Sequence, residues 1–217
     1  MRDDSTLGPL LGVVVTVLMC VSLSAQATPN GPAPKNTAKP WSFNLTTDGY
    51  IVPNEQGYVN PTFTADHGWL HLEARYNYED FHTGSLWFGR NFKVGNELVF
   101  KVTPMLGGVF GRTTGIAPGC EASLAYKKVE ISISNEYVFD TSHSSGSFYY
   151  AWPQLTYSPW SWLNVGLVAQ HTQTVHTSFA LQRGFLVGTS YKDVEFTTYV
   201  FNPEADPTVV LEVGFSF

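Results

Sequence analysis

Histidine, serine and acidic side chains are the groups of this 217-residue chain that could perform hydrolysis, and two short segments bring candidates of these types close together in sequence. The members are Asp140, His143, Ser144, Ser145, His171, His176 and Ser178. A hydrolase needs a nucleophile within hydrogen-bond reach of a histidine that a third group orients. Neither segment has a nucleophile and a histidine two residues apart on a strand face that would contact lipid. The same residue types are also common in loops. The sequence predicts no catalytic residue, and a hydrolase is kept as an alternative.

Metal ligands are sparse as well. His67 and His71 are four residues apart, but in a strand their backbones would lie roughly 13 Å from each other, which is too far for one ion. Cys120 lies in an apolar stretch, so we expect it to be a small apolar packing residue and not a metal ligand. The sequence therefore predicts neither a metal site nor a cofactor.

The charged residues fall mostly in segments where polar and apolar residues alternate. From residue 70 to residue 78 the even-numbered positions are apolar, whereas His71, Glu73, Arg75 and Asn77 lie between them. The chain ends on another such segment, TVVLEVGFSF at 208–217. A period of two predicts strands with one apolar and one polar face.

Alternation of this kind recurs from Trp41 to the end of the chain. It predicts about twelve strands, with ten or fourteen as alternatives. Short and long connections alternate between them, as in an antiparallel meander. The expected ranges are 41–53, 57–66, 68–78, 83–93, 97–110, 116–127, 128–139, 147–158, 161–172, 177–191, 193–202 and 208–217.

The composition helps to choose the environment of these strands. The chain is 43% hydrophobic, 15% aromatic and only 14% charged, with a net charge of −6, which argues against nucleic-acid binding. The polar faces mix small residues with few charges, and aromatic residues gather near the strand ends, as at a membrane interface. These features favour a transmembrane β-barrel over a soluble barrel or sandwich.

The N-terminal residues predict export. An apolar run from Leu7 to Leu23 precedes a small-x-small pattern that ends at Ala27, which is typical of a secretory signal peptide over 1–27. A Pro-rich lead-in is expected over 28–40, followed by the barrel domain over 41–217.

Together, the signal peptide, the alternating strands and the terminal aromatic strand resemble those of Gram-negative outer-membrane β-barrel proteins, in particular a small porin-like group. The resemblance covers about residues 41–217 and matches no specific family, so no functional residue is transferred from it. It implies a location in the bacterial outer membrane, contact with outer-membrane lipid, and recognition of Phe215 and Phe217 by the barrel-assembly machinery. It gives no oligomeric state.

The polar faces predict what would line the barrel. The expected lumen residues are Glu73, Arg75, Lys101, Glu121, Lys127, Glu130, Glu136, Glu195 and Glu212. Acidic groups predominate, which favours a narrow passive channel for small neutral or cationic solutes. A non-conducting structural or partner-binding barrel is the alternative, because these charges could instead pair with one another.

Two arginines occupy alternate strand positions that otherwise hold apolar residues. Arg90 follows Leu86 and Phe88, and Arg183 follows Leu181. An arginine that faced lipid at mid-bilayer would cost about 2–4 kcal/mol. The preferred hypothesis is a β-bulge at the neighbouring glycine that turns each arginine into the lumen. The alternative places both at headgroup level, where they could bind lipopolysaccharide phosphate.

Overall fold

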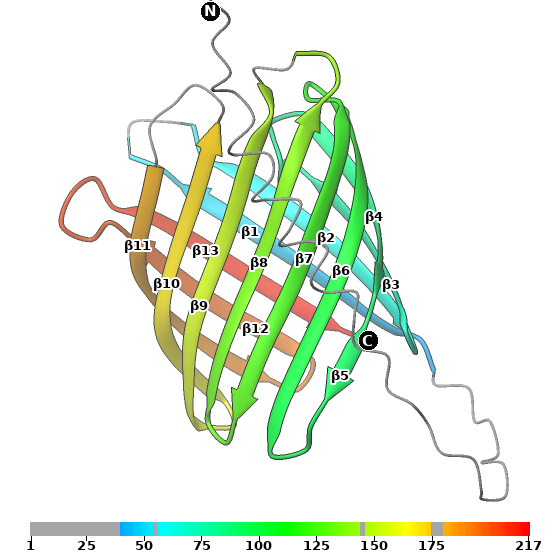
Figure 1. Ribbon diagram of the computed structural model, residues 1–217. Coiled ribbons are helices and arrows are strands. Elements are labelled where there is room, and N and C mark those ends of the chain that lie inside the picture. The colour runs from blue at the N-terminus through cyan, green and yellow to red at the C-terminus, as the bar shows by residue number, and fades with distance from the viewer. Residues whose placement is uncertain (1–39, 54–55, 144–145, 175–179) are drawn as a thin grey trace, which may run out of the picture. The chain divides into compact units, whose positions relative to one another are not determined.

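The computed structural model describes residues 40–53, 56–143, 146–174 and 180–217 (Figure 1). No helix among these residues is long and apolar enough to cross a membrane. The predicted signal peptide and all but the last residue of the predicted lead-in lie outside them and stay predictions. The strands are β1 (Ser42–Ile51), β2 (Tyr58–His67), β3 (Leu70–Tyr76), β4 (Thr83–Arg90), β5 (Phe92–Val94), β6 (Leu98–Gly111), β7 (Gly115–Tyr126), β8 (Val129–Asp140), β9 (Phe148–Trp160), β10 (Leu163–Thr174), β11 (Ala180–Tyr191), β12 (Val194–Phe201) and β13 (Thr208–Ser216).

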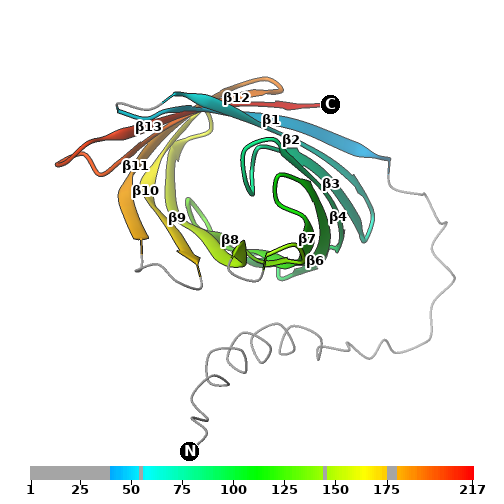
Figure 2. The same ribbon diagram turned by 90° about the horizontal axis from the view of Figure 1, so that it is seen from above.

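All thirteen strands belong to one antiparallel sheet, which closes because β4 and β5 both pair with β6 (Figure 2). Gly89 pairs with Met105 and Phe92 pairs with Val102, so β4 and β5 are two pieces of one strand in a single register. They are interrupted around Asn91, near Pro104 of β6, which has no N–H to donate. The fold is therefore a closed twelve-stranded barrel, which confirms the predicted fold class and strand number.

The C-terminal strand completes the ring. β13 pairs with β1 from Asn44–Ser216 to Ile51–Val209. Beyond the strand, the Phe217 N–H donates to the Phe43 carbonyl at 3.0 Å, and the Phe43 N–H donates to the Phe217 carbonyl at 2.9 Å. An apolar strand at the very end of the chain has no open edge here, because closure satisfies its backbone groups.

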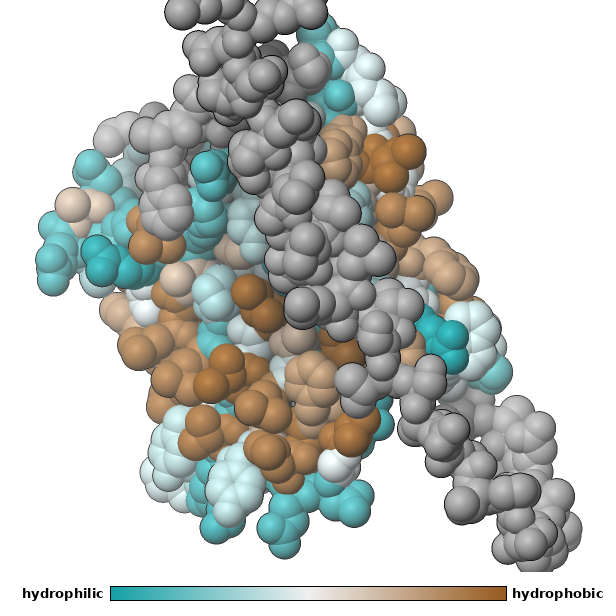
Figure 3. Space-filling view, viewed as in Figure 1, coloured by the Kyte–Doolittle hydropathy of each residue, from teal (hydrophilic) through white to brown (hydrophobic). Residues whose placement is uncertain are grey.

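The outer face of the barrel is apolar. Large hydrophobic side chains at alternate strand positions are more than half exposed, among them Leu86 (61%), Phe88 (54%) and Leu106 (57%). Figure 3 shows hydrophobic side chains gathered over the strands, with hydrophilic residues beyond them at both ends. A continuous apolar surface of this kind suits lipid and not water, so the barrel is of the transmembrane type.

The connections distinguish the two ends of the barrel. At one end, called the turn end, strands are joined by short turns such as 68–69, 127–128 and 192–193. At the other, called the loop end, connections such as 77–82 and 202–207 are longer. Lys127, which was predicted to line the lumen, instead occupies the β7–β8 turn with φ 54° and lies with its Nζ 5.0 Å from the centre of the Tyr126 ring.

Candidate functional site

The polar faces of the strands form the inner wall of the barrel. Directly paired residues of antiparallel strands share a face, and cross-lumen contacts identify the inner one, since Arg75 of β3 reaches Glu136 of β8. The remaining predicted lumen residues follow this parity: Glu73, Arg75, Lys101, Glu121, Glu130, Glu136, Glu195 and Glu212. Asp48, Asp66 and Lys93 lie on the same face, because they pair with Glu212, His71 and Lys101.

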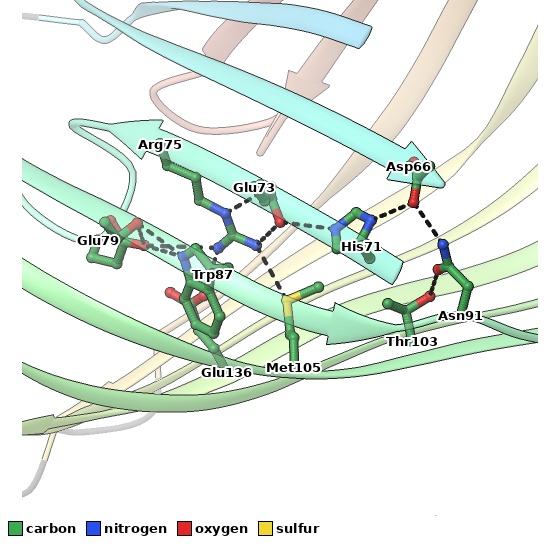
Figure 4. Close-up of polar contacts among 11 residues, drawn as sticks. Asp66, His71, Glu73, Arg75, Glu79, Trp87, Asn91, Thr103, Met105 and Glu136 are labelled. Atoms are coloured by element: carbon green, nitrogen blue, oxygen red, sulfur yellow. Dashed lines mark hydrogen bonds and ion pairs between the residues drawn. The ribbon is translucent and has the colours of Figure 1, made fainter. Parts of the chain in front are cut away.

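Arg75 is the centre of a buried ion-pair cluster (Figure 4). Its Nε donates to Glu73 Oε1 at 2.8 Å and its Nη1 donates to Glu136 Oε2 at 2.6 Å, while Glu79 Oε1 lies 3.8 Å from the same Nη1. The four side chains are between 0% and 4% exposed. A charge this deeply buried persists only when it is paired and hydrogen-bonded, so the cluster fixes the distance between β3 and β8.

Glu79 and Trp87 extend this cluster toward the loop end. Ser85 Oγ donates to Glu79 Oε1 at 2.5 Å, and Trp87 Nε1 donates to Ser85 Oγ at 2.9 Å. The Arg75 guanidinium carbon lies 4.5 Å from the centre of the Trp87 ring, within cation–π range. Glu79 comes from the 77–82 loop and not from a strand, so a loop supplies part of the interior.

A second polar chain lies nearer the turn end. His71 Nδ1 is 2.9 Å from Asp66 Oδ1, which also accepts a hydrogen bond from Asn91 Nδ2 at 2.6 Å. Thr103 Oγ1 donates to Asn91 Oδ1 at 2.7 Å. The side chain of Asn91 is therefore bonded to β2 and β6, while its backbone N–H donates to the Trp69 carbonyl at 2.7 Å.

The loop half of the interior, from the level of Arg75 to the loop end, is packed with apolar and aromatic side chains. One buried group consists of Tyr50, Val168, Leu186, Tyr199, Phe201 and Val210, and another of Trp87, Met105, Val109, Ala117 and Val138. Tyr78 of the 77–82 loop meets Tyr150 of β9 edge to face, with ring centres 5.6 Å apart. Contacts from β3 and its loop to β8 and β9 therefore span the lumen.

The turn half of the interior, between Arg75 and the turn end, is more open. A cavity of about 310 Å³ lies along the inner wall of β6–β9, and its polar lining includes Lys101, Thr103, Glu121, Glu130, Ser132 and Gln154. A second cavity of about 470 Å³ lies near the chain end, between Asn44, Thr64, Asp66, Asp193 and Ser216. Polar side chains line both cavities together with apolar ones, such as Trp152 in the first and Phe43 and Phe217 in the second.

Glu195 and Glu212 lie on the inner wall at β12 and β13, and Glu195 is only two residues from the 192–193 turn. Tyr199 Oη donates to Glu212 Oε2 at 3.2 Å, and Asn164 Nδ2 donates to Glu195 Oε1 at 3.4 Å. Asp48 pairs with Glu212 across β1 and β13, so two carboxyl groups are neighbours there. The described inner wall is thus acidic, with Arg75, Lys93 and Lys101 as its basic residues.

Outside the barrel wall, the 77–82 loop is fixed to the next loop by Asp80. Arg112 Nε donates to Asp80 Oδ2 at 2.7 Å, and Thr113 Oγ1 donates to the same oxygen at 2.9 Å. Partial burial alone would raise the pKa of Asp80, but the hydrogen bonds from Arg112, Thr113 and the Phe81 N–H outweigh it and lower that pKa. The loop that carries Glu79 is therefore held at both its inner and its outer side.

Arg90 and Arg183 are exposed on the outer face. The predicted bulges are absent, because the pairings of β4 with β6 and of β11 with both neighbours run without a register shift at Gly89 and Gly184. Arg90 lies near the turn end, 5.6 Å from the Trp69 ring centre and 5.1 Å from that of Phe92. Arg183 lies near the loop end, so the two arginines lie toward opposite ends of the barrel.

The residues considered for hydrolysis do not form a described site. Asp140 Oδ1 accepts hydrogen bonds from the backbone N–H groups of Ser142 and His143, which is the role of a turn-capping residue. The His171 ring lies 5.9 Å from the Tyr149 ring. The other candidates, Ser144, Ser145, His176 and Ser178, lie outside the described residues. Within the described ranges, no group of three or more His, Cys, Asp or Glu side chains could hold a metal ion.

Comparison with known proteins identifies the fold. No family model matches the chain, and no curated protein does. Among solved structures, the KdgM porin superposes with a TM-score of 0.58 at 10% identity, over 80% of this chain and 99% of that one. A structure of the NanC porin in a rhombohedral crystal form gives 0.55 at 14% identity, over 80% and 98%. At these identities the comparison shows a shared small-barrel fold, which confirms the resemblance predicted from the sequence.

A third similar structure contains a ligand. The KdgM porin in complex with disordered oligogalacturonate superposes with a TM-score of 0.56 at 11% identity, over 81% of this chain and 99% of that one.

Proposed function

We propose that this protein is a narrow passive channel of the bacterial outer membrane that passes small neutral or cationic solutes. The observation that carries the proposal is the inner wall, which combines cavities lined by polar residues with more acidic than basic side chains. Rings or walls of carboxylates attract cations into a pore and repel anions. The similarity to the fold of two porins supports the same class of function.

The acidic inner wall also indicates the charge of the solutes that could pass. Oligogalacturonate, the ligand in one of the similar porin structures, carries carboxylates and is therefore an anion. Glu121 and Glu130 line one cavity of this chain, and Glu195 and Glu212 lie on the inner wall at β12 and β13. A polyanionic solute would be repelled there at close range, so the proposed solutes differ in charge from that ligand.

The proposed location follows from the outer surface and the chain ends. In the proposed orientation the turn end faces the periplasm and the loop end faces the cell exterior, as the short and long connections of such barrels do. The predicted signal peptide over 1–27 would direct export, and Phe215 and Phe217, which are 45% and 61% exposed, would be presented to the assembly machinery.

Ion conductance in planar lipid bilayers tests the proposal. The purified, folded barrel is expected to give discrete conductance steps in KCl, and a KCl gradient is expected to give a reversal potential of the sign for cation preference. Glu130→Gln, which removes one charge from the cavity wall, should reduce that preference without abolishing the current. A correctly folded barrel that gives no current above that of the detergent alone would refute the channel.

A further inference from the structure

The cluster around Arg75 contains more negative than positive charge. Three carboxyl groups, those of Glu73, Glu79 and Glu136, surround one guanidinium group. Their side chains are 4%, 0% and 4% exposed, so bulk water does not offset the excess. Because an uncompensated buried charge is costly, such a site attracts a further positive charge.

Two oxygen atoms of this cluster have no hydrogen-bond partner among the residues that the structure describes. They are Glu79 Oε2 and Glu136 Oε1, and each belongs to a carboxyl group whose other oxygen contacts Nη1 of Arg75. The two carboxyl groups are thus neighbours around one N–H group and both keep an unused acceptor. Buried acceptors of native proteins are normally satisfied, so this pair is suited to accept a further hydrogen bond or to contact a cation.

We infer that Glu79 and Glu136 together bind one small monovalent cation, such as K⁺ or Na⁺, beside Arg75, and that this subsite lies on the conduction path. The cation site itself does not depend on the proposed function, but its place on the conduction path rests on it. Carboxylate oxygens are hard ligands that suit hard cations. No group of three or more His, Cys, Asp or Glu side chains in the described ranges is arranged to hold a metal ion, so a pair of carboxyl groups suits weak and reversible binding better than a resident divalent ion.

The positions of the two ligands give the subsite its place in the lumen. Glu136 projects from β8, while Glu79 comes from the 77–82 loop, which joins β3 to β4 on the other side of the cluster. A cation held between them would sit where the interior is crossed by side chains. The subsite would therefore lie at the constriction and not in the wider turn half.

A proton is the competing source of positive charge, and the groups that face the site must be considered for it. They are Glu73 and Arg75 of β3, Tyr78 of the loop, Trp87 of β4, Glu136 of β8, Tyr150 of β9 and, through Glu73, His71. Proton binding would respond to pH but not to the kind of alkali cation. The dependence of stability on K⁺ and its dependence on pH therefore distinguish a bound cation from a bound proton.

The first experiment measures the reversal potential of single-substitution barrels in a KCl gradient. Glu79→Gln and Glu136→Gln remove one ligand charge each and keep the side-chain shape, and Glu195→Gln serves as a control on the more exposed wall. The cation-to-anion permeability ratio is expected to fall about fivefold in the first two, which corresponds to about 1 kcal/mol of lost attraction, and to fall less in the control. Conducting variants with unchanged ratios would overturn the inference.

The second experiment needs no channel activity and no variant. The unfolding temperature of the detergent-solubilised barrel is measured as KCl replaces choline chloride at constant ionic strength, because a ligand that binds only the folded state stabilises it. The temperature is expected to rise with KCl in the wild-type barrel and to stay flat in Glu79→Gln. A temperature that depends on pH but not on K⁺ would overturn the cation subsite in favour of a proton.

These two readouts also separate the inference from the function on which it rests. A wild-type barrel that is stabilised by K⁺ but carries no current would refute the channel and leave the cation site. A conducting barrel with no K⁺ stabilisation would do the reverse.

Discussion

The loop half and the turn half of the barrel are built by the same alternating strands, yet their interiors differ. In the loop half, Phe201, Val138 and Val210 are fully buried, and Arg75 is enclosed by three carboxyl groups. In the turn half, cavities of about 310 and 470 Å³ remain, and each has several polar side chains in its lining. The comparison shows that strand number alone does not determine how open a barrel is.

The physical origin of the difference is side-chain size and the contribution of loops. Twelve strands enclose more space than the eight or so whose inward side chains fill a barrel by themselves. Trp87, Tyr150 and the loop residues Tyr78 and Glu79 occupy that space in the loop half. Serine, threonine and glutamine leave it free in the turn half. A channel in this barrel would be limited by its loop half.

Replacing Arg75 by methionine is expected to have the largest effect on stability. Arg75→Met leaves the buried Glu73, Glu79 and Glu136 without their cation, which should cost about 3–5 kcal/mol of unfolding free energy. Urea unfolding of the barrel in detergent, followed by tryptophan fluorescence, measures this cost. Lys101→Met removes an exposed charge from the turn half and should change stability by less than about 1 kcal/mol. Equal losses in the two variants would mean that the halves do not differ as described.

A glycine pair on β6 offers a matched test of packing. A Cβ at Gly107 would lie 2.6 Å from the buried Trp87 ring, whereas a Cβ at the next residue, Gly108, would meet nothing within 4 Å. Gly107→Ala should therefore destabilise the barrel by about 1–3 kcal/mol through overpacking, while Gly108→Ala should be nearly neutral. The same urea titration compares them. Neutral behaviour of both would show that the interior at Trp87 is looser than the structure indicates.

The strand pattern of this fold could be read from the sequence because period-two alternation is a direct consequence of strand geometry. It predicted twelve strands in a barrel and an inward position for residues such as Glu136 and Glu212. Closure of the ring then brought together residues that are far apart along the chain, such as Arg75 and Glu136. No local pattern reveals that contact.

The part of the site that sequence reasoning missed lies mainly where alternation stops. Glu79 is in a loop, and its inward direction depends on the base of that loop, where Asn77 and His82 have φ values of 57° and 55° and are joined by a hydrogen bond. Asp48 and Asp66 do lie on alternating strands and could have been included by parity. The two arginines teach the opposite lesson, because the uninterrupted alternation correctly placed Arg90 and Arg183 outward and the predicted bulges were wrong.

The ion pair between Asp80 and Arg112 should make a small contribution to stability that depends on pH. Asp80 has a lowered pKa in the folded state, so its pairing stabilises the fold above the unfolded value of about 3.9 and is lost as the pH falls through the folded value. Asp80→Asn should lower stability by less than about 1 kcal/mol at neutral pH and by less still near pH 2, because the pairing is lost as Asp80 becomes protonated. Unfolding temperatures at the two pH values check this, with the exposed Glu204→Gln as control. An equal effect at both values would exclude the ionised pair as its cause.

The contrast between the two halves is tested most directly by the reactivity of single cysteines facing the lumen. In a barrel with Cys20 and Cys120 replaced by serine, Ser123→Cys places a thiol in the wall of the turn-half cavity, and Ser85→Cys places one beside Glu79 and Trp87. A small cationic thiol reagent should modify the cysteine at position 123 rapidly and the one at position 85 far more slowly, because Ser85 is only 1% exposed. Equal rates at the two positions would contradict a packed loop half above an open turn half.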